Sequence, residues 1–201
     1  MVLKSDLVKA FDRVNWTFLR LVLLQIGVPL IGINWIMGCI ESSNFDVLVN
    51  GMPSKFFPVS RGIRQGCPIS PLLFILIIEI LSLLIYNDVQ RGAISGVNIS
   101  SLNLTHLLFV DDVILFGLGT LGEWQHYKEL LDLFCSTTGM KISNDKSSFL
   151  YNDIDEHMKE YISSLLPFKM EPLSVGFKYL GYYIKPLGYC VNEWIWLIKK
   201  N

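Results

Sequence analysis

The sequence predicts an α+β fold in which an antiparallel sheet carries helices packed on one face. Some segments repeat apolar residues at helical spacing, whereas others are short apolar runs typical of strands. Several of the strand pairs are separated by short turns, as in antiparallel hairpins. Helices and strands are interspersed, and no linker or repeat divides the 201 residues. We therefore expect one large domain, or a piece of a longer protein.

The first elements are expected to be a strand and two helices. Residues 1–6 form a short apolar segment that ends on Asp6. Apolar residues at helical spacing follow Asp12, which we expect to be the N-cap of the first helix. This helix should end at Gly27, with Pro29 just beyond it. A second helix is expected over residues 31–41.

The middle of the chain predicts a hairpin, a loop and an apolar helix. Residues 45–49 and 56–59 flank an Asn50-Gly51 turn, and a Gly- and Pro-punctuated loop covers 61–71. Residues 72–86 are apolar apart from Glu79 and Ser82. This run is shorter than the roughly 20 residues of a membrane span, and Glu79 lies in its middle. We expect a helix buried on most faces of a core and no stable membrane association, with a membrane anchor as a distant alternative.

The second half predicts another hairpin between helical segments. Residues 92–102 are expected to be loop or weak strand. Residues 107–116 should form a hairpin with Asp111 and Asp112 at its tip. An amphipathic helix over 123–135 follows, with Gly139 after it, and a further helix is expected over 154–166. Residues 177–184 are typical of a strand.

Composition limits the function classes. Hydrophobic residues make up 51% of the chain and charged residues 17%, so a sizeable core is available and disorder is excluded. The net charge of −1 gives no electrostatic reason to expect a nucleic-acid partner. Four cysteines without CxxC spacing indicate free buried thiols in a reducing, intracellular compartment. The opening residues do not resemble a signal peptide.

The adjacent acids Asp111 and Asp112 allow two interpretations. Asp is common in turns, so the pair could be a solvated turn. Alternatively, two close like charges favour a cation, and a third carboxylate would complete a metal site. Asp6 is the best third candidate because it also ends an apolar strand. An all-carboxylate site suits Mg²⁺ or Mn²⁺, and two such ions can activate a hydroxyl and stabilise a leaving phosphate oxygen.

The order of five motifs resembles the reverse transcriptase domain, specifically the palm, of non-LTR (LINE-type) retrotransposons. The segments that match palm motifs A to E are DLVKAFD at 6–12, RGIRQGCPISPLLF at 61–74, FVDD at 109–112, GMKISNDKS at 139–147 and FKYLG at 177–181. The resemblance implies a polymerase palm with a ferredoxin-like antiparallel sheet. It also implies an RNA-directed DNA polymerase that uses two Mg²⁺ or Mn²⁺ ions, a dNTP substrate, an RNA template and a DNA primer.

The resemblance also implies roles for the three acids and a lysine. Asp6 and Asp111 would be the metal ligands, with Asp112 as a supporting carboxylate. Lys146 would be the general acid that protonates pyrophosphate, although a lysine on such a loop could simply be solvated.

Other positions match nucleotide-binding residues of the family. Phe11 occupies the position of the steric gate that rejects a ribose 2′-hydroxyl, and its alternative role is a core aromatic. Gln65 and Gly66 would lie against nucleotide and template, or belong to an ordinary loop before a helix. Arg64 could contact phosphate or be solvated.

The remaining residues have simpler expected roles. Residues Tyr179 to Gly181 resemble the primer grip, although plain packing would also explain the aromatic side chain. We expect Asp12 to cap a helix rather than bind metal, His106 to be packed or hydrogen-bonded, and Cys67 to be a small buried residue.

The matching segments start almost at residue 1, so we expect a partial reverse transcriptase domain over 1–201, with fingers and thumb largely missing. Those regions would carry phosphate-binding charge, and the chain could need them from elsewhere. We therefore predict little or no polymerase activity for the isolated polypeptide. The alternative is a truncated, catalytically inactive retroelement remnant that keeps the palm fold.

Overall fold

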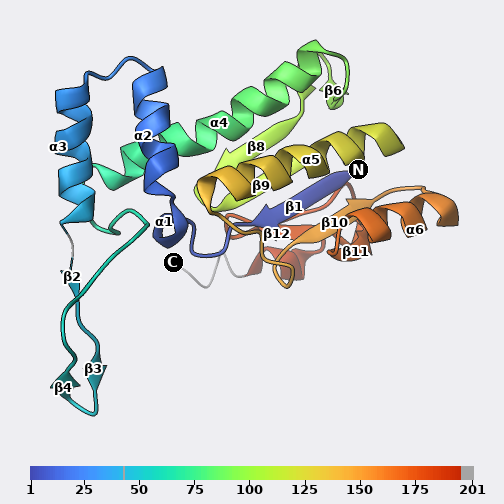
Figure 1. Ribbon diagram of the computed structural model, residues 1–201. Helices are drawn as coiled ribbons and strands as arrows, with labels where there is room; N and C mark the ends of the chain where they lie inside the picture. Colours follow the sequence, from blue (N-terminus) through green and yellow to red (C-terminus); the bar gives the residue numbers. More distant parts are fainter. Residues whose placement is uncertain (43, 196–201) are drawn as a thin grey trace.

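A computed structural model describes residues 1–42 and 44–195 (Figure 1). Its centre is a five-stranded sheet with the order β11-β10-β1-β9-β8. The strands are β1 (Val2–Asp6), β8 (His106–Phe109), β9 (Asp112–Phe116), β10 (Ser148–Tyr151) and β11 (Lys169–Pro172). The first four in chain order have the spatial order 4-1-3-2 and are antiparallel to their neighbours, which is the expected ferredoxin-like arrangement. The fifth departs from the expectation, because β11 pairs with β10 in parallel after α6 crosses over.

In the described part of the chain, six helices accompany the sheet, and their buried side chains join one hydrophobic core with the sheet residues Leu3, Val113 and Phe149. Helices α4 and α5, which contribute to this core, run alongside the strands of the sheet in Figure 1. The predicted α+β architecture with helices on one face is therefore confirmed. The helices are α1 (Ala10–Arg13), α2 (Trp16–Gln25), α3 (Leu30–Glu41), α4 (Ser70–Gln90), α5 (Leu121–Thr138) and α6 (Glu156–Leu165).

The cap of the first long helix differs from the expectation. Asn15, not Asp12, is the N-cap of α2, and its side-chain oxygen accepts hydrogen bonds from the N–H groups of Thr17 and Phe18. Asp12 lies inside the short helix α1. The periodicity could not separate these positions because the single turn of α1 places Asp12 just before the same apolar run. The helix expected over 123–135 runs from Leu121 to Thr138, and Gly139 directly after it adopts φ +79°, so Gly139 ends the helix itself rather than a separate turn.

The expectation that residues 72–86 are buried on most faces is wrong. Only 33% of the most apolar 18-residue stretch of α4 is buried. One side, including Phe74, Ile77 and Leu81, belongs to the core, whereas Leu72 and Ile75 are more than half exposed. By length and composition α4 could cross a bilayer, a property that it shares with many core helices. Composition counts apolar residues but cannot say how many faces neighbouring elements cover.

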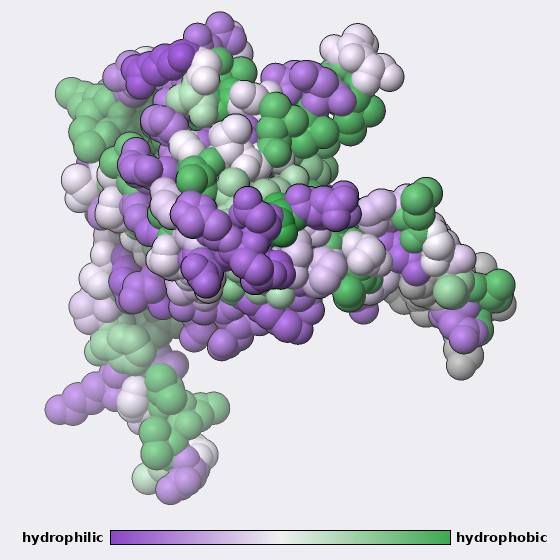
Figure 2. All heavy atoms as spheres, turned by 90° about the vertical axis from the view of Figure 1, so that its right-hand side faces the viewer, coloured by the Kyte–Doolittle hydropathy of each residue, from purple (hydrophilic) through white to green (hydrophobic). Residues whose placement is uncertain are grey.

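Two hairpins lie outside the central sheet between α3 and β8. The expected hairpin at Asn50-Gly51 is present as two short ladders, in which β2 (Asn44–Phe45) pairs with β5 (Phe57–Pro58) and β3 (Leu48–Val49) pairs with β4 (Met52–Pro53). It projects from the body, and Figure 2 shows hydrophobic side chains on its surface. The segment expected to be loop or weak strand over 92–102 contains short strands, since β6 (Val97–Ile99) pairs with β7 (Leu102–Leu104) as a hairpin.

A small second cluster covers part of the opposite face of the sheet. Val2, Ile114 and Leu150 are buried there, and Phe177 and Tyr179 pack against them. The last two residues belong to β12 (Phe177–Tyr179), which pairs with β13 (Tyr182–Ile184) as a hairpin rather than one continuous strand. Short 3₁₀ turns, η1 (Leu173–Val175) and η2 (Val191–Glu193), flank this hairpin.

The four cysteines are free, as expected, but they are not all buried. Cys39 and Cys190 are exposed, whereas Cys67 and Cys135 are partly buried. The expectation of buried thiols is therefore wrong for two of them. Cysteine spacing indicates pairing or its absence and carries no information on which helix face or loop is covered.

Candidate active site

The pairing of β1 with β9 brings two of the three predicted acids together. In this antiparallel ladder Asp6 is the register partner of Asp112, so both side chains lie on the same face at the end of the sheet. Asp111 is one residue further on, and its carbonyl oxygen accepts a hydrogen bond of 2.9 Å from the N–H of Leu7. Only Asp111 lies in the turn between β8 and β9, next to Val110 at φ +52°. The expectation that both acids are at the tip is therefore corrected, because Asp112 is the first residue of β9.

The three carboxylates make this end of the sheet electrostatically unfavourable. Burial raises the pKa of Asp112, and the charges of Asp111 and Asp6 raise it further, while Lys4 and Lys146 oppose the shift. The ionised form of Asp112 is therefore disfavoured at this position, chiefly because burial removes it from water. A cation at these strand ends would favour the ionised form.

Lys146 lies beside this group of acids. Its Nζ is 3.6 Å from Oδ1 of Asp6, and the lysine side chain is 70% exposed against 17% for Asp6. An exposed pair of this kind adds little stability, so Lys146 remains free to contact a ligand. The expected closeness of Lys146 to the acids is present, and its role as a general acid stays a prediction.

Two serines to which the motif comparison gave no role attach the loop at 143–147 to the backbone of Asp6. The carbonyl of Asp6 accepts a 2.8 Å hydrogen bond from the N–H of Ser143, and the N–H of Asp6 donates a 3.3 Å hydrogen bond to Oγ of Ser147. The N–H of Ser147 in turn donates to the carbonyl of Ser143. Ser147 is buried. Both serines lie in the segment at 139–147 that matches motif D, but a hydroxyl residue on a loop is too common to indicate a role by itself.

The donor set fits a hard divalent cation. Three carboxylates and no thiol or imidazole are the ligands that Mg²⁺ or Mn²⁺ prefers. Among residues 1–42 and 44–195, however, no three acidic, His or Cys side chains are grouped closely enough to hold a metal directly. Asp6 forms an ion pair with Lys146 and lies opposite Asp112 in the ladder, whereas Asp111 is exposed.

Phe11 is placed by a sharp turn and by a ring stack. Lys9 adopts φ +48°, which turns the chain from β1 into α1. The Phe11 ring stacks on Phe74 of α4, with ring centroids 4.6 Å apart and an interplanar angle of 8°. Phe11 is only partly buried at the edge of the core, so both expected roles, core aromatic and gate, remain compatible with its position. The supporting ring of Phe74 was not predicted.

The loop before α4 is fastened to α1 and α2 by its backbone. The N–H of Ile63 donates to the carbonyl of Phe11, and the carbonyl of Gly62 accepts a 2.7 Å bond from Nε1 of Trp16. A Cβ on Gly62 would lie 2.7 Å from the backbone oxygen of Asp12. Gly66 also has positive φ, at +85°, but open space surrounds its Cα. The predicted close approach of a ligand to Gly66 is therefore sterically available.

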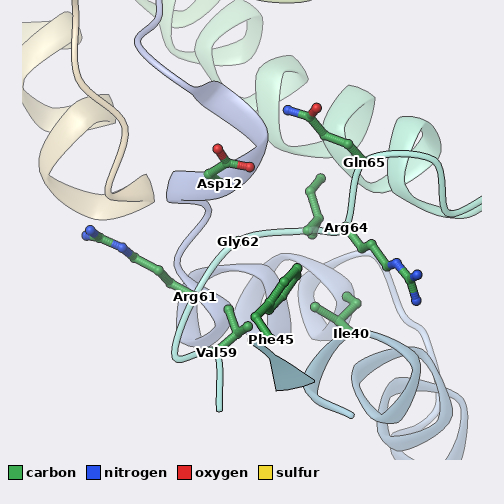
Figure 3. Close-up of a pocket in the computed structure, with 9 residues that line it drawn as sticks. Asp12, Ile40, Phe45, Val59, Arg61, Gly62, Arg64 and Gln65 are labelled. Carbon is green, nitrogen blue, oxygen red and sulfur yellow. The ribbon is translucent and has the colours of Figure 1, made fainter. Parts of the chain in front are cut away.

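Arg64 and Gln65 line a cavity of about 480 Å³ together with Asp12 and Arg61 (Figure 3). Residues Ile40 and Phe45 form its apolar side. Asp6, Asp111 and Lys146 do not line this cavity. The structure thus separates the predicted positions into a carboxylate group at the sheet end and a second group around the loop at 61–66.

The β12–β13 hairpin lies near the acids. Burial, and then the charge of Asp112, raises the pKa of Tyr179, so this ring is close to the carboxylate group. That position agrees with the expected primer grip without testing it. His106 is hydrogen-bonded as expected, through Nε2 to Ser82 and Nδ1 to Thr105, both at 2.9 Å.

Comparison with known proteins decides the family. The family profile described as "Reverse transcriptase (RNA-dependent DNA polymerase)" matches residues 1–184. The chain belongs to the reverse transcriptase family. The resemblance of its five motifs to this domain is thereby confirmed.

The curated relatives include retrotransposon proteins. The Pol polyprotein of the type-2 retrotransposable element R2DM of Drosophila melanogaster is 27% identical over 70% of this chain and 13% of its own length. The transposon TX1 uncharacterized 149 kDa protein of Xenopus laevis is 27% identical over 95% of this chain and 14% of its own. An uncharacterized mitochondrial protein of Arabidopsis thaliana is 45% identical over 32% of this chain and 55% of its own. The chain thus spans about a seventh of the length of the two transposon proteins.

Solved structures with the same fold are telomerases. Apo telomerase of Candida tropicalis superposes with a TM-score of 0.63 at 14% identity, covering 92% of this chain and 33% of that one. Telomerase of Candida albicans, in complex with a fragment of telomeric RNA, gives 0.58 at 12% identity over 92% and 30%. At this identity the likeness shows the fold alone. The expected palm-type polymerase fold is confirmed.

Proposed function

We propose that this chain carries the catalytic palm of an RNA-directed DNA polymerase, which joins a dNTP to a primer 3′-hydroxyl and releases pyrophosphate. The observation that carries the proposal is the register of β1 and β9, which sets Asp6 opposite Asp112 with Asp111 adjacent. Three acids at one sheet end have no structural need for each other, because they repel. Membership of the reverse transcriptase family supports the same reaction.

Asp6 and Asp111 would hold two Mg²⁺ or Mn²⁺ ions, with Asp112 beside them. When bound, these ions lower the barrier by activating the attacking hydroxyl and stabilising charge on the phosphate oxygens. The protein's own part is to hold the carboxylates in place. Hydrogen bonds from Ser143 and to Ser147 fix the backbone of Asp6, and the β1–β9 ladder fixes Asp112.

Three residues are proposed to act on the substrates. Lys146, 3.6 Å from Asp6, would donate a proton to the leaving pyrophosphate. Phe11, held flat against Phe74, would lie under the incoming sugar and exclude a 2′-hydroxyl by collision. The exposed residues at 64–66 would contact nucleotide and template, with the RNA template and DNA primer as the expected partners.

Calorimetric titration with Mn²⁺ tests the proposed metal site. The wild-type chain should bind the ion, and Asp111→Ala should abolish binding while leaving the unfolding temperature close to that of the wild type, because Asp111 is exposed. Asp145→Ala is the matched control, since this exposed acid lies on the loop at 143–147 and contacts none of the three carboxylates in the described structure. No Mn²⁺ binding by the wild-type chain would contradict the proposal.

Primer extension tests the reaction itself. The assay uses a DNA primer on an RNA template with Mg²⁺ and compares the wild-type chain with Asp111→Ala. The fingers and thumb regions are supplied, because little or no extension is expected from this chain alone. Extension that Asp111→Ala removes supports the proposal, whereas no extension at all, or extension that survives the substitution, would contradict it.

A further inference from the structure

A second cavity, of about 400 Å³, lies on the other side of Arg61 from the cavity in Figure 3. Its walls come from the start of α2, the loop at residues 60–61, the end of α3 and the turn after α5. Three arginines line it, Arg13, Arg20 and Arg61. Figure 3 shows the guanidinium of Arg61 directed away from Asp12 and Arg64, toward the end of α5.

The arginines of this chain divide into paired and unpaired groups. Arg20 and Arg91 form ion pairs with Glu41 and Asp88. The other three arginines, Arg13, Arg61 and Arg64, have no carboxylate partner among the residues that the structure describes. Arg13 lines the second cavity, Arg64 lines the cavity in Figure 3, and Arg61 lines both. A chain of net charge −1 therefore concentrates its unpaired guanidinium groups along one surface.

Arg13 carries a further sign of a missing partner. Its Nε is buried and makes no hydrogen bond within the described part of the chain. A buried donor without an acceptor costs roughly 1–3 kcal/mol, so such groups are normally satisfied. An anion in the cavity would provide the acceptor, and phosphate oxygens match the fork geometry of a guanidinium.

The walls of the cavity are rigid. The N–H of Gly62 donates to the carbonyl of Val14 at 2.8 Å, and Trp16 Nε1 bonds to Gly62 from the other side. The N–H of Asn15 donates to the carbonyl of Thr138, which joins α2 to the end of α5. The arginines are therefore attached to a fixed frame, and binding does not have to order the backbone first.

We propose that Arg13 and Arg61 bind a phosphate of a nucleic-acid strand, and that Arg64 binds a neighbouring phosphate of the same strand in the adjoining cavity. A strand is favoured over a free anion because two cavities share one arginine, which suits a ligand with repeated phosphates. This inference rests on the proposed function, which supplies the strand and already places Arg64 beside it, and it adds Arg13 and Arg61, to which the proposed function gives no role.

Salt-dependent binding of a labelled single-stranded RNA tests the inference. Fluorescence anisotropy is measured between about 50 and 200 mM salt, and each phosphate contact adds about 0.7 to the slope of log affinity against log salt. Arg61→Gln should reduce the slope by about 0.7 and weaken binding several-fold. Arg61 is exposed, so the variant should fold, and its unfolding temperature is measured in parallel. Arg13→Lys, which keeps the charge but removes Nε, should weaken binding and leave the slope unchanged.

Arg91→Gln is the matched control, because it removes the same charge from the far end of α4 and should leave the slope unaltered. Equal slopes for the wild type, Arg61→Gln and Arg91→Gln would overturn the inference, as would no RNA binding at the lowest salt. Displacement of the RNA by inorganic phosphate at equal phosphate concentration and matched ionic strength would also overturn it, in favour of a free-anion site.

The two proposals fail separately. Normal Mn²⁺ binding with no effect of Arg61→Gln on RNA affinity overturns only the phosphate cavity. Arg61-dependent RNA binding without Mn²⁺ binding overturns only the proposed catalytic site.

Discussion

Replacing Glu123 by glutamine should destabilise the protein far more than an ordinary surface change. Glu123 is only 3% exposed at the start of α5, and its carboxylate accepts four backbone hydrogen bonds. One oxygen accepts from Ser95 and Gly96 at 2.9 and 3.0 Å, and the other accepts from Leu118 and Gly119 at 2.8 and 3.4 Å. This one side chain therefore ties the segment before the β6–β7 hairpin to the loop that follows β9.

The expected magnitude follows from counting those bonds. Glutamine keeps one acceptor oxygen, but its amide NH₂ would face two backbone N–H donors. Two hydrogen bonds to a charged group are lost and two donors remain unsatisfied in a largely buried site, at roughly 1–3 kcal/mol each. We expect Glu123→Gln to lower the free energy of unfolding by about 2–5 kcal/mol. Glu129→Gln, an exposed change on the same helix, should alter it by less than about 0.5 kcal/mol.

Urea denaturation followed by tryptophan fluorescence measures this difference. The buried Trp124 is adjacent to Glu123 and reports on the same region. A loss of less than about 1 kcal/mol for Glu123→Gln would refute the reasoning, because the carboxylate would then be replaceable by one acceptor and solvent.

Three further predictions concern the site. Because the pKa of Asp112 is raised above its ordinary value of 3.8, folding favours the protonated carboxyl, and its contribution to stability falls as the pH rises through that range. Asp112→Asn should therefore increase the free energy of unfolding at neutral pH but not well below pH 4, and an equal effect in urea titrations at both pH values would contradict this. Gly66→Ala should lower the free energy of unfolding by about 1 kcal/mol, because φ is +85°. Gly62→Ala should lower it by clearly more, because its new Cβ would also lie 2.7 Å from a backbone oxygen. Equal unfolding midpoints for the two variants would contradict this argument. In primer extension with the fingers and thumb regions supplied, Phe11→Val should lower the preference for dNTP over rNTP by about tenfold or more. Phe18→Val, which changes a second partly buried phenylalanine nearby in the sequence, should leave that preference unchanged.

Local patterns in the sequence predicted most elements of the fold. The helical spacing of residues in α3 and α5, the Asn50-Gly51 turn and the two apolar runs around Asp111 depend on contacts within a few residues, so they are readable without the tertiary structure. The cap of α2 was misassigned because two polar residues, Asp12 and Asn15, precede the same apolar face. Only the backbone path through Lys9 and α1 decides between them.

The surroundings of the candidate site were not predictable in this way. Lys146 was named from its motif, but its 3.6 Å approach to Asp6 depends on two serines that tie separate segments together. The stack of Phe11 on Phe74 joins residues far apart in the chain. Such contacts depend on register and packing, which composition and periodicity do not encode.

The sequence by itself determined that two acids follow an apolar strand, that a third ends another, and that five motifs occur in the order of a reverse transcriptase palm. These features depend on residue type and order alone. The tertiary structure decided that Asp6 faces Asp112 rather than Asp111, because a ladder pairs residues by register and reverses side-chain direction at every step. It also decided that Glu123 is buried and that three arginines without a carboxylate partner in the described structure line neighbouring cavities, since burial and cavities form only when distant segments meet.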